Sequence, residues 1–262
     1  MSNYETIIYE KNDMVVTIIL NRPDQLNAMS PEVYHELYDA MEAIDADDDV
    51  RVVIFKGAGK AFCAGADLKA MQPSLEKSSL TFKYLEMVHR TYNRIERLNK
   101  PTIAQVHGMC LAGGIELIES CDIIVAADTA RIGDQHSALG LLPGGGSTQR
   151  LPRQMNFRKA KEILLTGEWM SAEDAYRFGF INHCVPEDQL EEKVNQIAAK
   201  LCKQSPMTSK AIKWAVNHGI NADLTTALRM EMATSAQHVF TDDFKEGIAS
   251  FLEKRKPEFH GF

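Results

Sequence analysis

Short runs of β-branched residues alternate with helical patterns as far as about residue 200, and this alternation limits the possible folds most strongly. We expect strands at residues 6–10, 15–20, 50–56, 102–106 and 123–126. Helices are expected where apolar residues recur every three or four positions, as they do after Ser30 and Pro31 and again from Leu85 to Leu98. A Gly/Ala-rich loop is expected from Gly57 to about Met71. Strands that alternate with helices predict a layered α/β fold.

The pattern changes near residue 189, and helical spacing then continues to about residue 252 with hardly a strand signal. We therefore predict an α/β core over residues 1–200 and a helical region over residues 201–262. The helical region is rich in apolar residues for a peripheral segment, namely Leu224, Leu228, Met230, Met232, Val239 and Phe240. These side chains either fold onto the chain's own core or cover surface in an oligomer, and the pattern alone does not decide between the two.

The composition excludes several classes of function. The chain of 262 residues has 29 basic and 36 acidic side chains and a net charge of −7, whereas nucleic acid and anionic membranes select basic surfaces. No apolar run approaches the ~18 residues of a transmembrane helix, and the N-terminus resembles neither a signal nor a transit peptide. The five cysteines form no C-x-x-C pair, which favours reduced thiols. We expect a cytoplasmic protein without a metal, a nucleic-acid partner or a membrane partner.

Two segments of the chain share one pattern of a strand, a small-residue turn, an acidic residue and Leu. The expected strand at residues 50–56 leads to residues 62–68 (FCAGADL), and the expected strand at residues 102–106 leads to residues 109–117 (MCLAGGIEL). Small side chains let a ligand approach the main chain, and a turn that enters a helix has unpaired N–H groups. Two such turns side by side could direct two N–H groups at one oxygen, as in an oxyanion hole. Tight packing without a ligand is the plainer alternative.

These two segments and residues 143–151 (PGGGSTQRL) resemble the enoyl-CoA hydratase/isomerase, or crotonase, superfamily. Arg22-Pro23 with Asn27-Ala28 resembles its N-terminal motif, and residues 251–259 (FLEKRKPEF) resemble its C-terminal motif. The resemblance implies a crotonase-like spiral of β-β-α repeats followed by a helical region that forms a homotrimer or a dimer of trimers. It implies an acyl-CoA substrate and no separate cofactor, because coenzyme A enters as part of the substrate.

The resemblance also assigns binding residues by position. The N–H groups of Ala66 and Gly113 would hold the thioester oxygen and stabilise the enolate common to the reactions of this family. The adenine and pantetheine parts of CoA would contact a set of residues from the first turn and its neighbourhood, namely Leu26, Ala64, Ala66, Asp67, Leu68 and Lys69. Lys254 would reach the CoA phosphates of a neighbouring subunit.

Two further positions decide the chemistry that the resemblance implies. Hydratases of this family place two Glu side chains around one water, and Glu116 falls on the first position. His136 falls on the second position, where Glu is usual. Imidazole titrates near neutral pH and can hold water or donate a proton, and Asp134 could orient it. The plainer alternatives are a solvent-exposed helix residue for Glu116 and a surface or pocket-wall side chain for His136.

We therefore predict an enoyl-CoA hydratase, a hydro-lyase with an atypical pair formed by Glu116 and His136. A double-bond isomerase with a single base remains an alternative, as does a hydrolase or C–C lyase that acts on a cyclic or branched acyl-CoA. A non-enzymatic relative that binds CoA or RNA is a further alternative, which Glu116 and the acidic net charge oppose. The chain has no P-loop lysine, no G-x-G-x-x-G after the first strand and no G-x-S-x-G, so nucleotide and serine-hydrolase chemistry is not supported.

Overall fold

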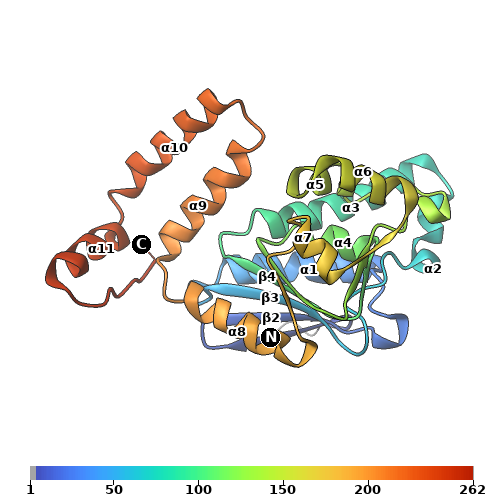
Figure 1. Cartoon of the computed structure of the whole chain (residues 1–262), viewed down its shortest axis with the longest axis horizontal. Helices are drawn as coiled ribbons and strands as arrows, with labels where there is room; N and C mark the ends of the chain where they lie inside the picture. Colours follow the sequence, from blue (N-terminus) through green and yellow to red (C-terminus); the bar gives the residue numbers. More distant parts are fainter. Residues whose placement is uncertain (1–3, 262) are drawn as a thin grey trace.

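Two sheets form the core in the computed structural model, which describes residues 4–261 (Figure 1). The larger sheet has six strands in the order β1 (Ile7–Asn12), β2 (Val15–Leu20), β3 (Val52–Gly57), β4 (Thr102–Val106), β6 (Ile123–Ala127) and β9 (His183–Val185). The smaller sheet has the order β5 (Met109–Leu111), β7 (Arg131–Gly133) and β8 (Trp169–Ser171). Among the described strands, only β1 with β2 and β7 with β8 pair antiparallel.

The chain passes from the larger sheet to the smaller one and then into a helix. Strand β4 leads to β5 and helix α4 (Gly113–Ile118), and β6 leads to β7 and then to α5 (Ser147–Gln154) and α6 (Phe157–Thr166). This order gives the expected spiral of β-β-α repeats. The segment after β4 was expected to be only a turn, but it contains strand β5. Strands β7, β8 and β9 were also not expected, because each is only three residues long and lacks a clear alternating pattern.

Helices α1 (Pro31–Asp45) and α3 (Ser78–Glu96) pack against each other beside the larger sheet. Pro31 occupies the first helical position, as predicted, but the Ser30 side chain forms no capping hydrogen bond. The apolar residues of α1 at helical spacing are all buried, namely Val33, Leu37, Ala40, Met41 and Ile44. The expected loop from Gly57 to Met71 ends in the short helix α2 (Leu68–Met71), because Asp67 caps it by accepting a hydrogen bond from the N–H of Ala70.

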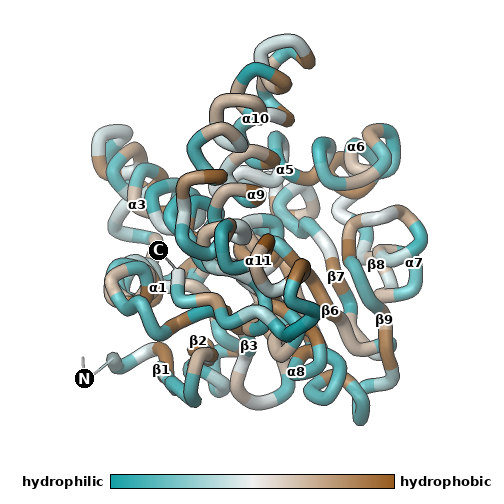
Figure 2. Tube along the Cα trace, turned by 90° about the vertical axis from the view of Figure 1, so that its left-hand side faces the viewer, coloured by the Kyte–Doolittle hydropathy of each residue, from teal (hydrophilic) through white to brown (hydrophobic). Residues whose placement is uncertain are grey.

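Helix α7 (Ala172–Arg177) follows β8, and α8 (Leu190–Leu201) packs on β4 and β6. The chain then enters an arm made of α9 (Pro206–Gly219), α10 (Leu224–His238) and α11 (Asp242–Glu253). Figure 1 shows α9 and α10 as a hairpin that extends away from the sheets, and Figure 2 shows α10 projecting beyond the rest of the chain. No helix in the described part of the chain is long and apolar enough to cross a membrane.

The apolar residues of the arm do not fold onto the chain's own core. Leu224 is 74% exposed, Met232 68% and Phe240 78%. The alternative in which these side chains fold back onto the core is therefore wrong for this chain. An isolated helical hairpin with exposed apolar side chains gains little from its own packing, which favours an arm that contacts other surface.

Candidate active site

The two small-residue turns lie side by side, as their shared pattern suggested. The backbones of Cys63 and Cys110 form an isolated parallel β-bridge. The N–H of Cys63 donates to the carbonyl of Met109 over 3.0 Å, and the N–H of Leu111 donates to the carbonyl of Cys63 over 2.9 Å. These bonds bring the first turn against the start of α4. A Cβ atom added to Gly113 would lie 3.3 Å from the amide nitrogen of Ala66.

The N–H groups of Ala66 and Gly113 donate no hydrogen bond to any group within residues 4–261. Each follows a residue with an uncommon backbone conformation. Gly65 has a φ of 105°, and Ala112 has a φ of 47° with a ψ of −114°. A positive φ is rare for a residue with a Cβ and is maintained only where the surrounding structure requires it. Two unpaired N–H groups on adjacent turns have the arrangement that an oxyanion hole needs.

Glu116 lies in the first turn of α4 and is only 3% exposed, so the alternative of a solvent-exposed helix residue is wrong. Its Oε1 accepts a 2.6 Å hydrogen bond from the N–H of Gly145, in the glycine-rich turn that precedes α5. Burial raises the pKa of the Glu116 carboxyl, while the positive charge of His136 and the Gly145 N–H act in the opposite direction. A buried carboxyl of this kind can act as a base when it is ionised and as an acid when it is protonated.

His136 follows β7 and lies against Asp134. The Nδ1 atom of His136 is 3.0 Å from both carboxylate oxygens of Asp134, and the backbone N–H of His136 donates to Oδ1 over 3.2 Å. The side chain of Asp134 is fully buried and that of His136 is 11% exposed, so His136 is not a surface residue. Burial alone would lower the pKa of His136, but the hydrogen bond and charge of Asp134 and the charge of Glu116 outweigh it and raise the pKa.

The sequence analysis missed a pair of tyrosines beneath the site. The Tyr92 hydroxyl donates a 2.7 Å hydrogen bond to the carbonyl of Gly113, and the Tyr34 hydroxyl lies 3.3 Å from that of Tyr92. Burial raises the pKa of Tyr92 well above its ordinary range, so its hydroxyl stays neutral and remains a donor. These tyrosines fix the peptide that begins α4. Tyr92 lies in the apolar stripe from Leu85 to Leu98 and Tyr34 lies on another helix, α1, so no sequence signal distinguished them from core residues.

Two charged residues near the site were also given no role by the sequence analysis. Arg150 donates to the carbonyl of Gly145 over 3.0 Å and forms an ion pair with Glu96 over 2.8 Å, so it holds the glycine-rich turn. Glu119 is 2% exposed and accepts a 3.1 Å hydrogen bond from the Ser147 hydroxyl. Burial raises the pKa of Glu119 well above its ordinary range.

The expected CoA-binding residues are only partly brought together. Ala64 donates from its N–H to the carbonyl of Leu26 over 2.9 Å, which places these two residues side by side. Leu68 and Lys69 lie exposed on α2. Asp67 pairs with Arg22 over 2.8 Å and caps α2, so its carboxylate holds the loop. Lys254 follows α11, and Figure 1 shows α11 at the opposite side of the molecule from α2.

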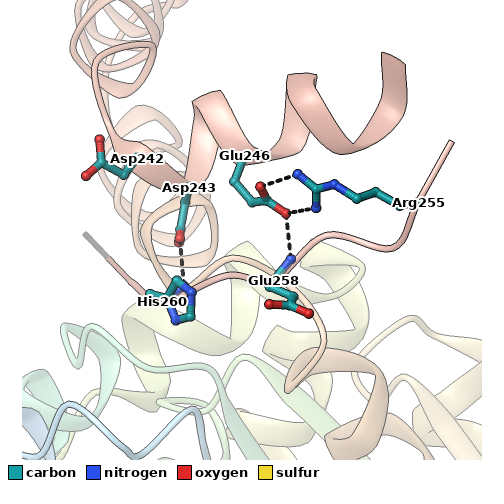
Figure 3. A pocket seen from close by; sticks show the side chains of 6 residues that line it. All are labelled: Asp242, Asp243, Glu246, Arg255, Glu258 and His260. Carbon is teal, nitrogen blue, oxygen red and sulfur yellow. Dashed lines mark hydrogen bonds and ion pairs between the residues drawn. The ribbon is translucent and has the colours of Figure 1, made fainter. Parts of the chain in front are cut away.

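A separate hollow of about 400 Å³ lies beneath α11 and is lined mainly by charged groups (Figure 3). Glu246 accepts hydrogen bonds from Arg255 over 2.8 Å and from the N–H of Glu258 over 2.8 Å. Asp243 accepts from the N–H of His260 over 2.9 Å and from the Ser205 hydroxyl over 2.6 Å. These groups fasten the C-terminal tail to the arm and do not form a reactive site. No cluster of metal-ligating side chains occurs in the part of the chain that the structure describes.

The chain is similar to known proteins along its whole length. The family model for enoyl-CoA hydratase/isomerase matches residues 10–261. A probable enoyl-CoA hydratase of Mycobacterium bovis is 38% identical over 256 residues, and a crotonyl-CoA hydratase of Syntrophomonas wolfei is 36% identical over 257 residues; each alignment covers 98% of both chains. The solved structure of an enoyl-CoA hydratase from Bacillus anthracis superposes with a TM-score of 0.93 at 37% identity and covers 98% of this chain and 100% of that one.

Proposed function

The chain belongs to the enoyl-CoA hydratase/isomerase family, and we propose that it adds water reversibly to the double bond of an enoyl-CoA thioester. One observation carries the proposal. The unpaired N–H groups of Ala66 and Gly113 lie on adjacent turns, and Gly113 begins the helix that carries the buried Glu116, whose carboxyl feels the charge of His136. The site therefore combines an oxyanion hole with two groups that can each move a proton.

The oxyanion hole activates the substrate in this mechanism. The thioester oxygen accepts hydrogen bonds from the N–H groups of Ala66 and Gly113, which draw electron density from the conjugated double bond toward that oxygen. The β-carbon becomes electrophilic as a result. The carboxylate of Glu116 takes a proton from a water molecule, the water oxygen bonds to the β-carbon, and the resulting enolate is stabilised by the same two N–H groups.

The second proton transfer completes the addition. The imidazolium of His136 gives a proton to the α-carbon, and the enolate returns to a thioester. The proton on Glu116 then passes to His136 through water, which restores both groups. The hydroxyl has been added to the β-carbon and the hydrogen to the α-carbon, and the bond between sulfur and the acyl group has not broken.

The isomerase alternative makes a different use of the same residues. There Glu116 alone moves a proton between two carbons, and His136 is only part of the pocket wall. The two hydrogen-bond contacts between Nδ1 of His136 and Asp134, at 3.0 Å each, favour hydration, because a pocket-wall residue needs no buried counter-charge.

We propose further that the exposed arm joins copies of the chain into a trimer or a dimer of trimers, and that Lys254 then contacts the CoA phosphates bound to a neighbouring copy. Within one chain, Leu26, Ala64, Asp67, Leu68 and Lys69 surround the path of the CoA moiety. No separate cofactor is required, because coenzyme A arrives with the substrate. The acidic net charge opposes a nucleic-acid or membrane partner, and unpaired cysteine thiols suit the cytoplasm.

A panel of enoyl-CoA thioesters with different acyl groups, followed by mass spectrometry, tests the proposed function. Hydration adds the mass of one water and keeps CoA attached, and we expect this result for at least one member of the panel. An unchanged mass with a moved double bond would identify an isomerase, and release of free CoA would identify a hydrolase.

A further inference from the structure

Asp134 is a fully buried carboxylate that lies against one imidazole and has no other charged partner among residues 4–261. We infer that Asp134 is a positioning residue that makes His136 a proton donor, and that the ion pair of Asp134 with His136 takes the place of a second neutral carboxylic acid beside Glu116. This inference deepens the proposed hydration and rests on it.

The hydrogen bonds determine which ring nitrogen faces the reaction. An ionised carboxylate only accepts hydrogen bonds, so Nδ1 of His136 carries a hydrogen that it donates to Asp134. Within the described residues no protein group bonds to Nε2, which leaves Nε2 as the ring nitrogen for water or substrate. The same Oδ1 atom of Asp134 also accepts the backbone N–H of His136 over 3.2 Å. The ring and its main chain are therefore anchored to one group.

The charge of Asp134 determines the protonation state of the His136 imidazole. A buried carboxylate without a counter-charge is strongly unfavourable, because no nearby positive charge offsets its loss of hydration. If the imidazole of His136 were neutral, the buried carboxylate of Asp134 would have no positive partner. The pair therefore favours the imidazolium form of His136. The two charges of the pair then cancel, and one transferable hydrogen remains on Nε2. A neutral carboxylic acid has the same two properties.

Other titratable groups around the pair do not supply that proton. Glu116, on α4, is the proton acceptor in the proposed reaction, and its negative charge helps to raise the pKa of His136. Glu119 is also buried, but its Oε2 accepts a hydrogen bond from the Ser147 hydroxyl, and within the described residues its carboxyl makes no hydrogen bond to His136 or Asp134. Arg150 is engaged by Glu96 and by the side chain of Asn93, to which Nη2 donates over 2.7 Å. The imidazolium of His136 is therefore the proton donor and the carboxylate of Glu116 the acceptor, which is what addition of water requires.

The test is the pH profile of kcat/KM for an enoyl-CoA, compared between the wild-type enzyme and Asp134→Asn. Loss of the Asp134 charge removes the main influence that raises the pKa of His136, so the donor loses its proton at lower pH. We expect the alkaline limb of the profile to move to lower pH, with a rate loss of about 10²-fold at neutral pH that shrinks as the pH falls. Asp134→Glu should restore part of the alkaline limb.

A matched variant separates this role from a structural one. The side chain of Gln135, in the same loop, donates to the carbonyl of Gly167. Gln135→Ala should lower the Tm without moving the alkaline limb. An alkaline limb that stays in place in folded Asp134→Asn overturns the inference.

A second measurement covers the case in which Asp134→Asn does not fold. The nitrogen NMR titration of His136 in the wild-type enzyme should show hydrogen on Nδ1 and a pKa above the ordinary value for histidine, whereas a pKa below that value overturns the inference. This readout does not depend on the reaction. If the acyl-CoA panel shows isomerisation, the proposed hydration fails while the titration still reports on the pair.

Discussion

The backbone N–H of Gly145 donates a 2.6 Å hydrogen bond to Oε1 of Glu116, and this bond joins the glycine-rich turn to the helix of the candidate active site. A side chain at position 145 has no room. A Cβ atom there would overlap Oε2 of Glu116 and would lie 2.7 Å from Cε2 of the Tyr92 ring. The glycine-rich turn therefore helps to align the carboxylate of Glu116. Arg150 holds the turn in place by donating a hydrogen bond to the carbonyl of Gly145.

Gly145→Ala should displace the carboxylate of Glu116 and lower kcat by about 10²-fold, the usual cost of a small misplacement of a catalytic group. The control is Gly144→Ala, because a Cβ there would meet only the flexible tip of Leu85, at 2.8 Å. Steady-state kinetics of both variants on one enoyl-CoA provide the comparison. Equal activity in the two variants would contradict the alignment role of Gly145.

Gly113→Pro removes one of the two N–H groups assigned to the oxyanion hole. Proline is tolerated at the first position of a helix, where Gly113 lies, so the fold should survive. We expect kcat to fall by at least about 10²–10³-fold, the loss typical of one oxyanion donor. Circular dichroism and the Tm establish folding. Full turnover by a folded variant would remove Gly113 from the oxyanion hole.

Glu116→Gln retains the shape of the side chain but not its basicity. Turnover should fall by about 10²–10⁴-fold, the range of a general acid–base contribution, while the Kd for a CoA thioester measured by calorimetry stays near that of the wild type. A large change in Kd with nearly unchanged kcat would instead make Glu116 a binding residue.

The wild-type pH profile of kcat/KM should be bell-shaped, because the proposed reaction needs Glu116 ionised and His136 protonated. Burial raises the pKa of Glu116, so activity should be lost on the acid side at a pH above the ordinary value for glutamate. The pKa of His136 is also raised, so activity should persist beyond the ordinary value for histidine before it falls. His136→Gln cannot titrate and should lack the alkaline limb. A variant profile that keeps this limb would assign it to another group.

The arm provides a prediction about assembly. Light scattering at micromolar concentration should give the mass of a trimer or a hexamer, because the apolar side chains of α10 are exposed in one chain. Phe240→Asp, in the arm, should shift the population toward smaller species. Leu165→Asp, at a similarly exposed apolar residue on α6 outside the arm, should not. A single monomeric species in the wild-type protein would contradict the proposed assembly.

The sequence predicted the parts of the fold that depend on long, regular patterns. The apolar stripe of α1 and the strand at Thr102–Val106 both lie where periodicity placed them. The three-residue strands β5, β7, β8 and β9 have too few residues to show a pattern, and they form because neighbouring strands offer hydrogen bonds.

The candidate site was predictable only where a motif marked it. The positions of Glu116 and His136 follow from the family resemblance, and Asp134 was suggested by its separation from His136. Tyr92 bonds the carbonyl of Gly113, 21 residues away, and Arg150 pairs with Glu96, 54 residues away. Spacing along the chain contains no information about such distant contacts. Glu119 was missed for a different reason, because only the packed structure shows that its carboxyl is buried.

Hydration by Glu116 can be followed by turnover of an enoyl-CoA in water labelled with heavy oxygen, with the wild-type enzyme and with Glu116→Gln. The wild-type product should gain one labelled oxygen on the β-carbon and keep CoA attached, and Glu116→Gln should form this product at least about 10²-fold more slowly. A wild-type product without the label, a label in a released carboxylic acid, or equal rates for the two proteins would contradict hydration by Glu116.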